Sequence, residues 1–199
     1  MNAHNMSIPV LLRTYHSREA PFDCKIWEAA RATSATPAIF KPIEIGMEQP
    51  FIDGGLGHNN PSRLLLDEAK DLFGNRQIGC LVSIGTGQAE MVSIMNPGVF
   101  QRIVPTDIVD VLKAITTDCE ATHESMLGLF ANSPNTYFRL NVEQGMQGID
   151  LSEWDKLSKI AAHTFHYLKK KEVDEKLALL VNAIRVPRGR LTIEQLSKL

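Results

Sequence analysis

The chain of 199 residues has few cysteines, no excess of positive charge and no long apolar run. Its three cysteines, Cys24, Cys80 and Cys119, are odd in number and widely spaced. This pattern indicates small buried thiols in a reducing compartment and gives no disulfide or metal framework. With 21 basic and 23 acidic residues, the net charge is −2, which argues against a nucleic-acid partner because such proteins carry a clustered basic face.

Targeting and membrane-spanning segments are also missing from the sequence. Residues 1–6 lack the basic region and apolar run of a signal peptide, and no window approaches the length of a transmembrane helix. There are no internal repeats or low-complexity segments. A hydrophobic content of 44% is nevertheless enough for one globular domain with a real core. We therefore expect a cytoplasmic protein that binds no nucleic acid.

The most informative segment is Phe51–Pro61, which places one carboxylate in a glycine-rich loop between an expected strand and an expected helix. Asp53 is followed by Gly54, Gly55 and Gly57, and glycine tolerates positive φ and lets a backbone or a ligand come close. The segment indicates a site built around Asp53. A second interpretation also stays open, in which the aspartate only hydrogen-bonds its own turn.

A helix is expected after this loop, with Asn60 as N-cap, Pro61 at its first position and Gly74 as its stop. Its apolar residues at helical spacing are Leu65, Ala69, Leu72 and Phe73. The apolar run 78–84 then predicts a strand buried on both faces. This order favours a right-handed crossover between parallel strands, which would put Asp53 at a strand's carboxyl end, where open α/β sheets hold ligands.

Further elements are expected on both sides of this unit. They are a strand at 7–15, a helix at 24–33 capped by Asp23, a hairpin at 40–52 that delivers Asp53, a long loop at 88–105, a helix at 106–130, a strand at 137–142, and helices at 152–166 and 172–184. In two of the helices the predicted apolar sides are Ile26, Trp27 and Ala30, and Trp154, Leu157, Ile160, Ala161 and Phe165.

Three motifs in order resemble one known family. They are Ile26-Trp-Glu-Ala-Ala-Arg-Ala-Thr-Ser-Ala-Thr-Pro-Ala-Ile-Phe40, then Phe51-Ile-Asp-Gly-Gly55 with Asn59-Asn-Pro61, then Ser83-Ile-Gly-Thr-Gly87. Together they resemble the patatin-like phospholipases, particularly the fungal members, over roughly residues 7–170. The resemblance implies a three-layer α/β fold, related to the α/β hydrolases, with a mainly parallel central sheet flanked by helices. It also implies that residues 1–170 are the C-terminal portion of a patatin-like domain and that 171–199 form a peripheral helix and tail.

The resemblance also assigns roles to residues. In that family a serine in a Gly-x-Ser-x-Gly turn is the nucleophile and the aspartate of an Asp-Gly-Gly motif is its base, so Asp53 is implied as the catalytic base and Asp53-Gly54-Gly55 as the motif. No Gly-x-Ser-x-Gly occurs in the 199 residues, and the glycine-rich oxyanion loop is missing too. Both belong upstream in the family, so we expect an N-terminally truncated domain. Without nucleophile and oxyanion donors, we expect the chain to be inactive alone.

Other candidates for catalysis have ordinary structural explanations. Ser34 lies in a turn of small residues and could replace the nucleophile, but a serine hydroxyl more commonly satisfies the local backbone. Ser83 lies inside an expected buried strand, which makes it a poorer candidate. His58 follows Asp53 by five residues, yet loop histidines are usually solvated, and the resembling enzymes use no histidine.

The C-terminal helices raise two further possibilities. His163 and His166 could share a helix face, but no third ligand stands at useful spacing, so we expect no metal site. The basic run Lys169–Lys171 favours anionic lipid surfaces, although a run this short is usually only solvated.

The resemblance thus implies a lipid acyl hydrolase of the phospholipase A2 type, with a lipid or phospholipid ester as substrate, peripheral membrane contact, no cofactor and a Ser-Asp dyad of which this chain holds only the base. One alternative is a non-catalytic lipid- or protein-binding fragment of a patatin-like protein. A second is an unrelated phosphate-binding protein that uses 54–57 or 85–87 as an anion loop, although neither matches a known phosphate-loop spacing.

Overall fold

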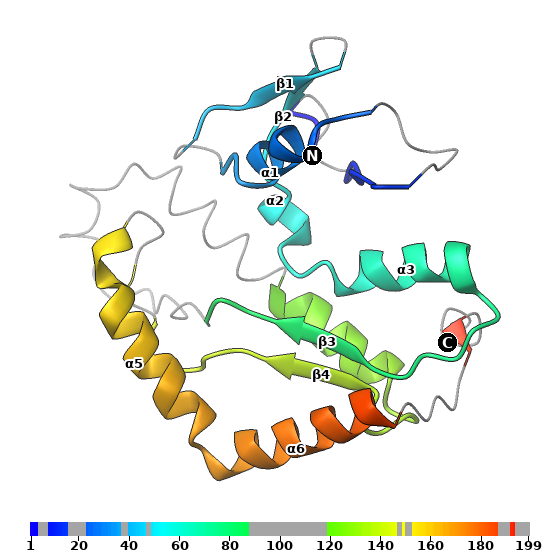
Figure 1. Cartoon of the computed structure of the whole chain (residues 1–199), viewed down its shortest axis with the longest axis vertical. Coiled ribbons are helices and arrows are strands. Elements are labelled where there is room, and N and C mark those ends of the chain that lie inside the picture. The colour runs from blue at the N-terminus through cyan, green and yellow to red at the C-terminus, as the bar shows by residue number, and fades with distance from the viewer. Residues whose placement is uncertain are drawn as a thin grey trace. The chain divides into compact units, whose positions relative to one another are not determined.

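The computed structural model describes residues 1–3, 8–15, 23–36, 40–46, 49–87, 119–146, 149, 153–186 and 192–193. By its internal contacts the chain divides into two compact units, one of residues 1–59 with 94–119 and one of residues 60–93 with 120–199. Figure 1 shows the elements of both. The division differs from the predicted domain boundary at residue 170, which stays a prediction because compact units need not coincide with family domains.

The first unit contains α1 (Ile26–Thr33), β1 (Ile43–Ile45), β2 (Gln49–Phe51) and the one-turn helix α2 (Gly55–His58). The two strands pair antiparallel, with Ile43 opposite Phe51, and Gly46 in the turn has a φ of 67°. The hairpin expected at 40–52 is therefore confirmed, and it leads directly to Asp53.

The core of the first unit is a cluster of Ala32, Ile45 and Phe51, with Val10 and Leu12 packed against it. Residues 8–15 reach this core without entering a sheet, so the strand predicted at 7–15 is wrong for the described part. The edge of β2 is instead taken by the segment 1–3, where residue 2 bridges residue 51 and residue 3 donates its N–H to the carbonyl of residue 50.

Helix α1 turns a different side to the core than its sequence pattern predicts. Ala32 is buried, whereas Ile26 and Trp27 are 86% and 59% exposed. The helix also starts at Ile26 rather than Cys24, and the carboxylate of Glu28 accepts the N–H of Lys25 at 2.7 Å. This bond satisfies one of the free donors of the first turn, in place of the predicted Asp23 cap.

The second unit contains the parallel strands β3 (Leu81–Ile84) and β4 (Tyr137–Leu140), the 3-10 turn η2 (Trp154–Lys156), and the helices α3 (Ser62–Phe73), α5 (Leu157–Leu168) and α6 (Lys171–Arg185). Residues 119–129 are also helical. The strand predicted at 137–142 and the helices predicted at 152–166 and 172–184 are confirmed, each with shifted ends.

The main core of the second unit gathers side chains from four segments: Leu66, Leu81, Met126, Phe130 and Ile193. In α3 the buried residues are Ser62 and Leu66, four residues apart on one face. The predicted apolar side is correct only at Ala69, which packs against this core, because Leu65, Leu72 and Phe73 are each 45–53% exposed.

A smaller core joins the end of β4 to α5 and α6 through Val142, Tyr167 and Val173. The Tyr167 hydroxyl accepts the N–H of Asn141 at 3.2 Å, so the ring is both packed and hydrogen-bonded. The side of α5 predicted to be buried instead faces solvent at Leu157 and Phe165.

The expected parallel pairing of the strands on either side of α3 is absent from the described residues. β2 pairs with β1, and β3 pairs with β4, in two separate sheets. Ile84 is 76% exposed, so β3 is not buried on both faces as predicted. The mixture of helices with parallel and antiparallel strands agrees with an α/β class, while the three-layer arrangement stays a prediction.

The remaining expectations fall partly outside the described residues. The long loop predicted at 88–105 and residues 106–118 of the predicted helix lie there. Cys24, Cys80 and Cys119 are of intermediate exposure, so they are less buried than predicted. Among the helices that the structure describes, none has the length and apolar composition of a membrane span.

The two faces of α3 can be compared by one pair of substitutions. Leu66→Ala empties a fully packed site and should lower the free energy of unfolding by about 2–5 kcal/mol. Leu65→Ala, on a side chain that is 53% exposed, should change it by less than about 0.5 kcal/mol. Urea unfolding followed by circular dichroism measures both, and equal losses would mean that the buried face is misassigned.

Candidate active site

Asp53 sits where the hairpin meets the turn after α1. Phe51 and Ile52 are buried, and Asp53 itself is half-buried. Its N–H donates to the carbonyl oxygen of Ala35 at 3.0 Å. The turn of small residues at 33–36 therefore lies beside this aspartate.

The Asp53 carboxylate accepts one hydrogen bond on each oxygen. Thr36 Oγ1 donates to Oδ2 at 3.1 Å, and the Gly55 N–H donates to Oδ1 at 3.2 Å. The second bond is the local turn contact that the sequence left open as an alternative role. Because an ionised carboxylate offers about four acceptor positions, both oxygens keep capacity for a proton donor. The two roles of Asp53 are therefore compatible.

Only one of the three glycines after Asp53 is required by the backbone conformation. Gly54 has a φ of −74° and open space around its α-carbon, while Gly55 begins α2. Of the three, only Gly57, with a φ of 107°, occupies a conformation that other residues rarely adopt. His58 closes the same short helix and makes no hydrogen bond to Asp53 within the described residues.

The N-terminal ammonium group also lies in this region. Met1 donates to the carbonyl oxygen of Ile52 at 2.7 Å. Burial lowers the pKa of this amine, and the Asp53 carboxylate opposes that shift.

Both serines considered as replacement nucleophiles make hydrogen bonds within their own unit. Ser34 Oγ donates to the carbonyl oxygens of Ala30 at 2.9 Å and of Arg31 at 3.2 Å, so its structural role is confirmed. Ser83 is buried in β3, as predicted.

Ser83 belongs to a polar network in the second unit. Its hydroxyl accepts from Arg139 Nη1 at 2.7 Å and donates to Asn60 Oδ1 at 3.1 Å. Asn60 Oδ1 also accepts from the Ser62 hydroxyl at 2.7 Å and from the Ser62 N–H at 3.4 Å. Asn60 was predicted as the N-cap of α3, but the helix begins at Ser62 with Pro61 as its N-cap residue, so Asn60 stands one position before the cap.

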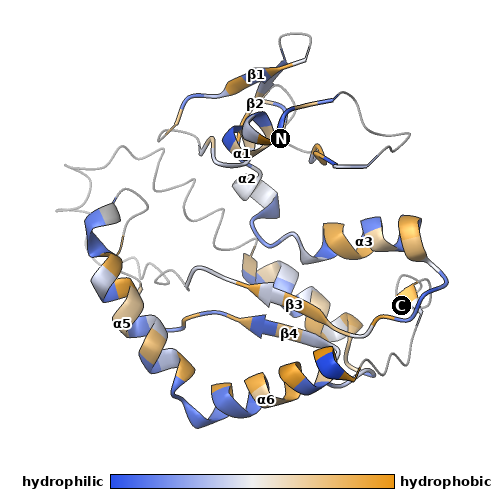
Figure 2. Ribbon diagram, viewed as in Figure 1, coloured by the Kyte–Doolittle hydropathy of each residue, from blue (hydrophilic) through white to orange (hydrophobic). Residues whose placement is uncertain are grey.

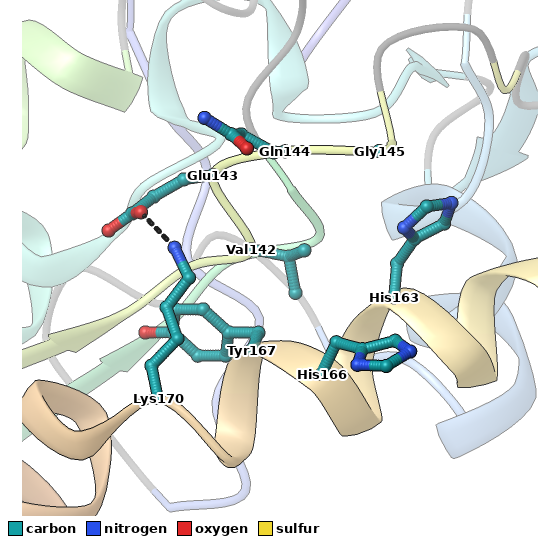
Figure 3. Close-up of a pocket in the computed structure, with 8 residues that line it drawn as sticks. All are labelled: Val142, Glu143, Gln144, Gly145, His163, His166, Tyr167 and Lys170. Atoms are coloured by element: carbon teal, nitrogen blue, oxygen red, sulfur yellow. Dashed lines mark hydrogen bonds and ion pairs between the residues drawn. The ribbon is translucent and has the colours of Figure 1, made fainter.

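A separate cavity of about 350 Å³ opens in the second unit between α5 and the segment after β4 (Figure 3). The side chains of His163, His166 and Tyr167 line it. At its edge Lys170 Nζ pairs with Glu143 Oε2 at 2.8 Å, and this hydrogen bond raises the pKa of Lys170. No third metal ligand is grouped with the two histidines in the part of the chain that the structure describes.

Comparison with known proteins bears on this site. A family model described as patatin-like phospholipase matches residues 2–66. The Rattus norvegicus protein named calcium-independent phospholipase A2-gamma is 33% identical over 174 residues, which cover 87% of this chain and 21% of that protein. Its Homo sapiens namesake is 35% identical over 149 residues, covering 74% of this chain and 18% of that protein.

A more distant relative carries a different kind of name. The Arabidopsis thaliana protein named probable inactive patatin-like protein 9 is 29% identical over 102 residues, which cover 46% of this chain and 27% of that protein. No solved structure matches the chain.

The geometry and the comparisons agree on one class. The hairpin, the turn after α1 and Asp53 define an α/β protein with a carboxylate held in a glycine turn, and all of them lie inside the matched residues. The chain belongs to the patatin-like phospholipase family. It spans about a fifth of the length of the mammalian relatives described above. The likeness to fungal members stays a prediction.

His123 should make the second unit less stable in acid. Its Nδ1 lies 3.1 Å from the Tyr137 hydroxyl, and burial, aided by Arg139 and Lys176, lowers its pKa. The unfolded chain therefore binds this proton first, so stability falls as the pH drops through the unfolded value of about 6.5. We expect His123→Gln to flatten the decline of unfolding free energy between about pH 7.5 and 5, measured in urea. Parallel curves for the two proteins would exclude this role.

Proposed function

We propose that this chain is the base-carrying portion of a patatin-like lipid acyl hydrolase, which cleaves phospholipid acyl esters at a membrane surface by a Ser-Asp dyad. The observation that carries the proposal is the Asp53 carboxylate, half-buried and hydrogen-bonded by Thr36 and Gly55. It lies within the residues that match the family model. The names of the mammalian relatives support phospholipids as the substrate class.

Asp53 would act as general base and then as general acid. The nucleophilic hydroxyl loses its proton to the carboxylate while its oxygen bonds to the ester carbonyl carbon. When the carbonyl re-forms, the bond to the leaving alcohol breaks, and that alcohol takes the proton from Asp53. Water then repeats the sequence on the acyl-enzyme and releases the fatty acid. Backbone N–H donors stabilise the charged oxygen at each stage, each contributing about 3 kcal/mol.

Thr36 would position this base. Its hydroxyl holds Oδ2 of Asp53, and the Asp53 N–H bond to Ala35 fixes the same two segments together. A carboxylate held from both the backbone and the side chain keeps its orientation, which a general base needs because proton transfer requires hydrogen-bond distance. Thr36 was not singled out from the sequence.

The nucleophile would have to come from a segment that carries Gly-x-Ser-x-Gly, because the 199 residues hold none. Ser34 and Ser83 donate their hydroxyls elsewhere, which supports the same conclusion. The chain alone should therefore neither form an acyl-enzyme nor hydrolyse phospholipid esters.

Labelling with a fluorophosphonate probe tests the dyad. We expect no label on the folded chain alone. The chain fused behind a patatin-like segment with Gly-x-Ser-x-Gly should be labelled on that serine and should release fatty acid from phosphatidylcholine. Asp53→Asn in the fusion should abolish both signals, because the amide cannot take the proton. Asp53-dependent labelling of a serine in the chain alone would contradict the proposal and identify a replacement nucleophile.

The role of Thr36 can be separated from a purely structural one in the same fusion. Thr36→Val removes the donor with little change in shape and should lower kcat by about tenfold or more, since a hydrogen bond to a charged group is worth about 1.5–3 kcal/mol. Thr36→Ser keeps the donor and should retain most of the activity. Equal losses in both variants, or a change confined to KM, would exclude positioning of the base.

A second candidate function is a non-catalytic lipid- or protein-binding fragment. The missing Gly-x-Ser-x-Gly favours it, and so does the relative whose name describes it as probably inactive. A fusion that folds and binds phospholipid vesicles, yet shows neither labelling nor turnover, would select this alternative over the hydrolase.

A further inference from the structure

Helix α5 exposes an apolar face. Leu157 is 67% exposed, Phe165 59% and Leu168 41%, and Ala161 is exposed between them. The spacing of four, four and three residues puts these side chains on one side of the helix. Figure 2 shows apolar residues along α5. We call these four residues the α5 face.

The adjoining side of α5 is packed against the rest of the second unit. Tyr167 is buried in a cluster with Val142 and Val173, and Ile160 and Thr164 are half-buried. The α5 face is therefore presented by a helix that is anchored along the adjoining side. Exposed apolar side chains grouped in this way are typical of a surface that binds a partner.

The charged side chains within α5 and the three residues after it are of one sign. From Leu157 to Lys171 the sequence has four lysines, two histidines and no aspartate or glutamate. Lys169 Nζ lies 5.4 Å from the ring centroid of Phe165, so a cation borders the apolar surface directly. The Lys171 side chain is 92% exposed. Two of these lysines have acidic partners: Lys170 Nζ pairs with Glu143 Oε2 at 2.8 Å, and the exposed Lys171 Nζ lies 3.8 Å from Glu175 Oε1.

We propose that the α5 face docks the chain on an anionic lipid surface. Its apolar side chains enter the boundary between headgroups and acyl chains, while Lys169 and Lys171 meet the anionic headgroups. A basic amphipathic helix suits a membrane surface, because its apolar side chains can be buried while its lysines stay at the level of the headgroups.

A second copy of the chain fits this surface less well. A symmetric contact would bring the lysines of one α5 close to those of the other, and like charges repel. The proposed function contributes only the choice of lipid as partner, since docking needs neither the nucleophile nor turnover.

Sedimentation with vesicles tests the docking on the full chain. We expect binding to phosphatidylcholine vesicles that contain about 30% phosphatidylserine, and at least about fivefold weaker binding to pure phosphatidylcholine. The double variant Leu157→Ser/Phe165→Ser should weaken binding by about tenfold or more. Lys169→Glu should weaken it by about fivefold and reduce its sensitivity to salt.

Matched controls use exposed residues elsewhere. Leu127→Ser/Ile184→Ser removes apolar side chains that are 45% and 57% exposed, and Lys41→Glu reverses a lysine outside α5. Both should bind as the unchanged chain does, with circular dichroism confirming that every variant folds.

Three outcomes would overturn the proposal. They are no binding by the unchanged folded chain, equal losses in test and control variants, or self-association in the ultracentrifuge that the double variant abolishes. The last result would assign the α5 face to a second copy. Because binding is measured without turnover, a failed docking test and a failed labelling test remain separate results.

Discussion

The contacts between Asp53 and the Ala35-Thr36 turn hold the candidate site together. The Asp53 N–H reaches Ala35 and its carboxylate reaches Thr36, so one residue is fixed by both backbone and side chain to a segment 17 positions away. The hairpin delivers the aspartate from one direction and α1 delivers the turn from the other. The cluster of Ala32, Ile45 and Phe51 packs these two elements together, which is how an apolar core far smaller than a full domain can orient a carboxylate.

Features of the fold that depend on short-range interactions could be predicted from the sequence, whereas those that depend on distant contacts could not. The hairpin, the strand at 137–140 and the end of α3 at Gly74 follow from short-range preferences, and the structure contains them. On α1, α3 and α5, most residues predicted to be buried are exposed, and only Ala69 and Ile160 are half-buried. Leu65 and Leu66 are equally apolar neighbours, and only the position of Leu81 and Met126 in space selects the second. Helical periodicity cannot supply that choice when apolar residues surround the helix.

The site shows the same division. Asp53 could be placed from its glycine motif, because the motif is contiguous in the chain. The role of Thr36 could not be predicted in this way. The turn contains several hydroxyls, and sequence spacing does not tell which of them will contact a carboxylate that follows the β1–β2 hairpin. Strand pairing was also difficult to predict, because it depends on segments that are distant in the sequence. β3 pairs with β4 across more than 50 residues, whereas the nearest preceding strand pairs with its own hairpin partner.

The polar network around Asn60 has a chemical consequence. The amide oxygen of Asn60 accepts hydrogen bonds from Ser62 and Ser83. Asn60 is buried, so an aspartate at this position would place a buried charge just before α3. Asparagine deamidates to aspartate when the backbone nitrogen of the next residue loses its hydrogen and attacks the side-chain amide carbon, which forms a succinimide. The next residue is Pro61, whose nitrogen carries no hydrogen. The network is thus built on an asparagine that is protected from deamidation by its own neighbour.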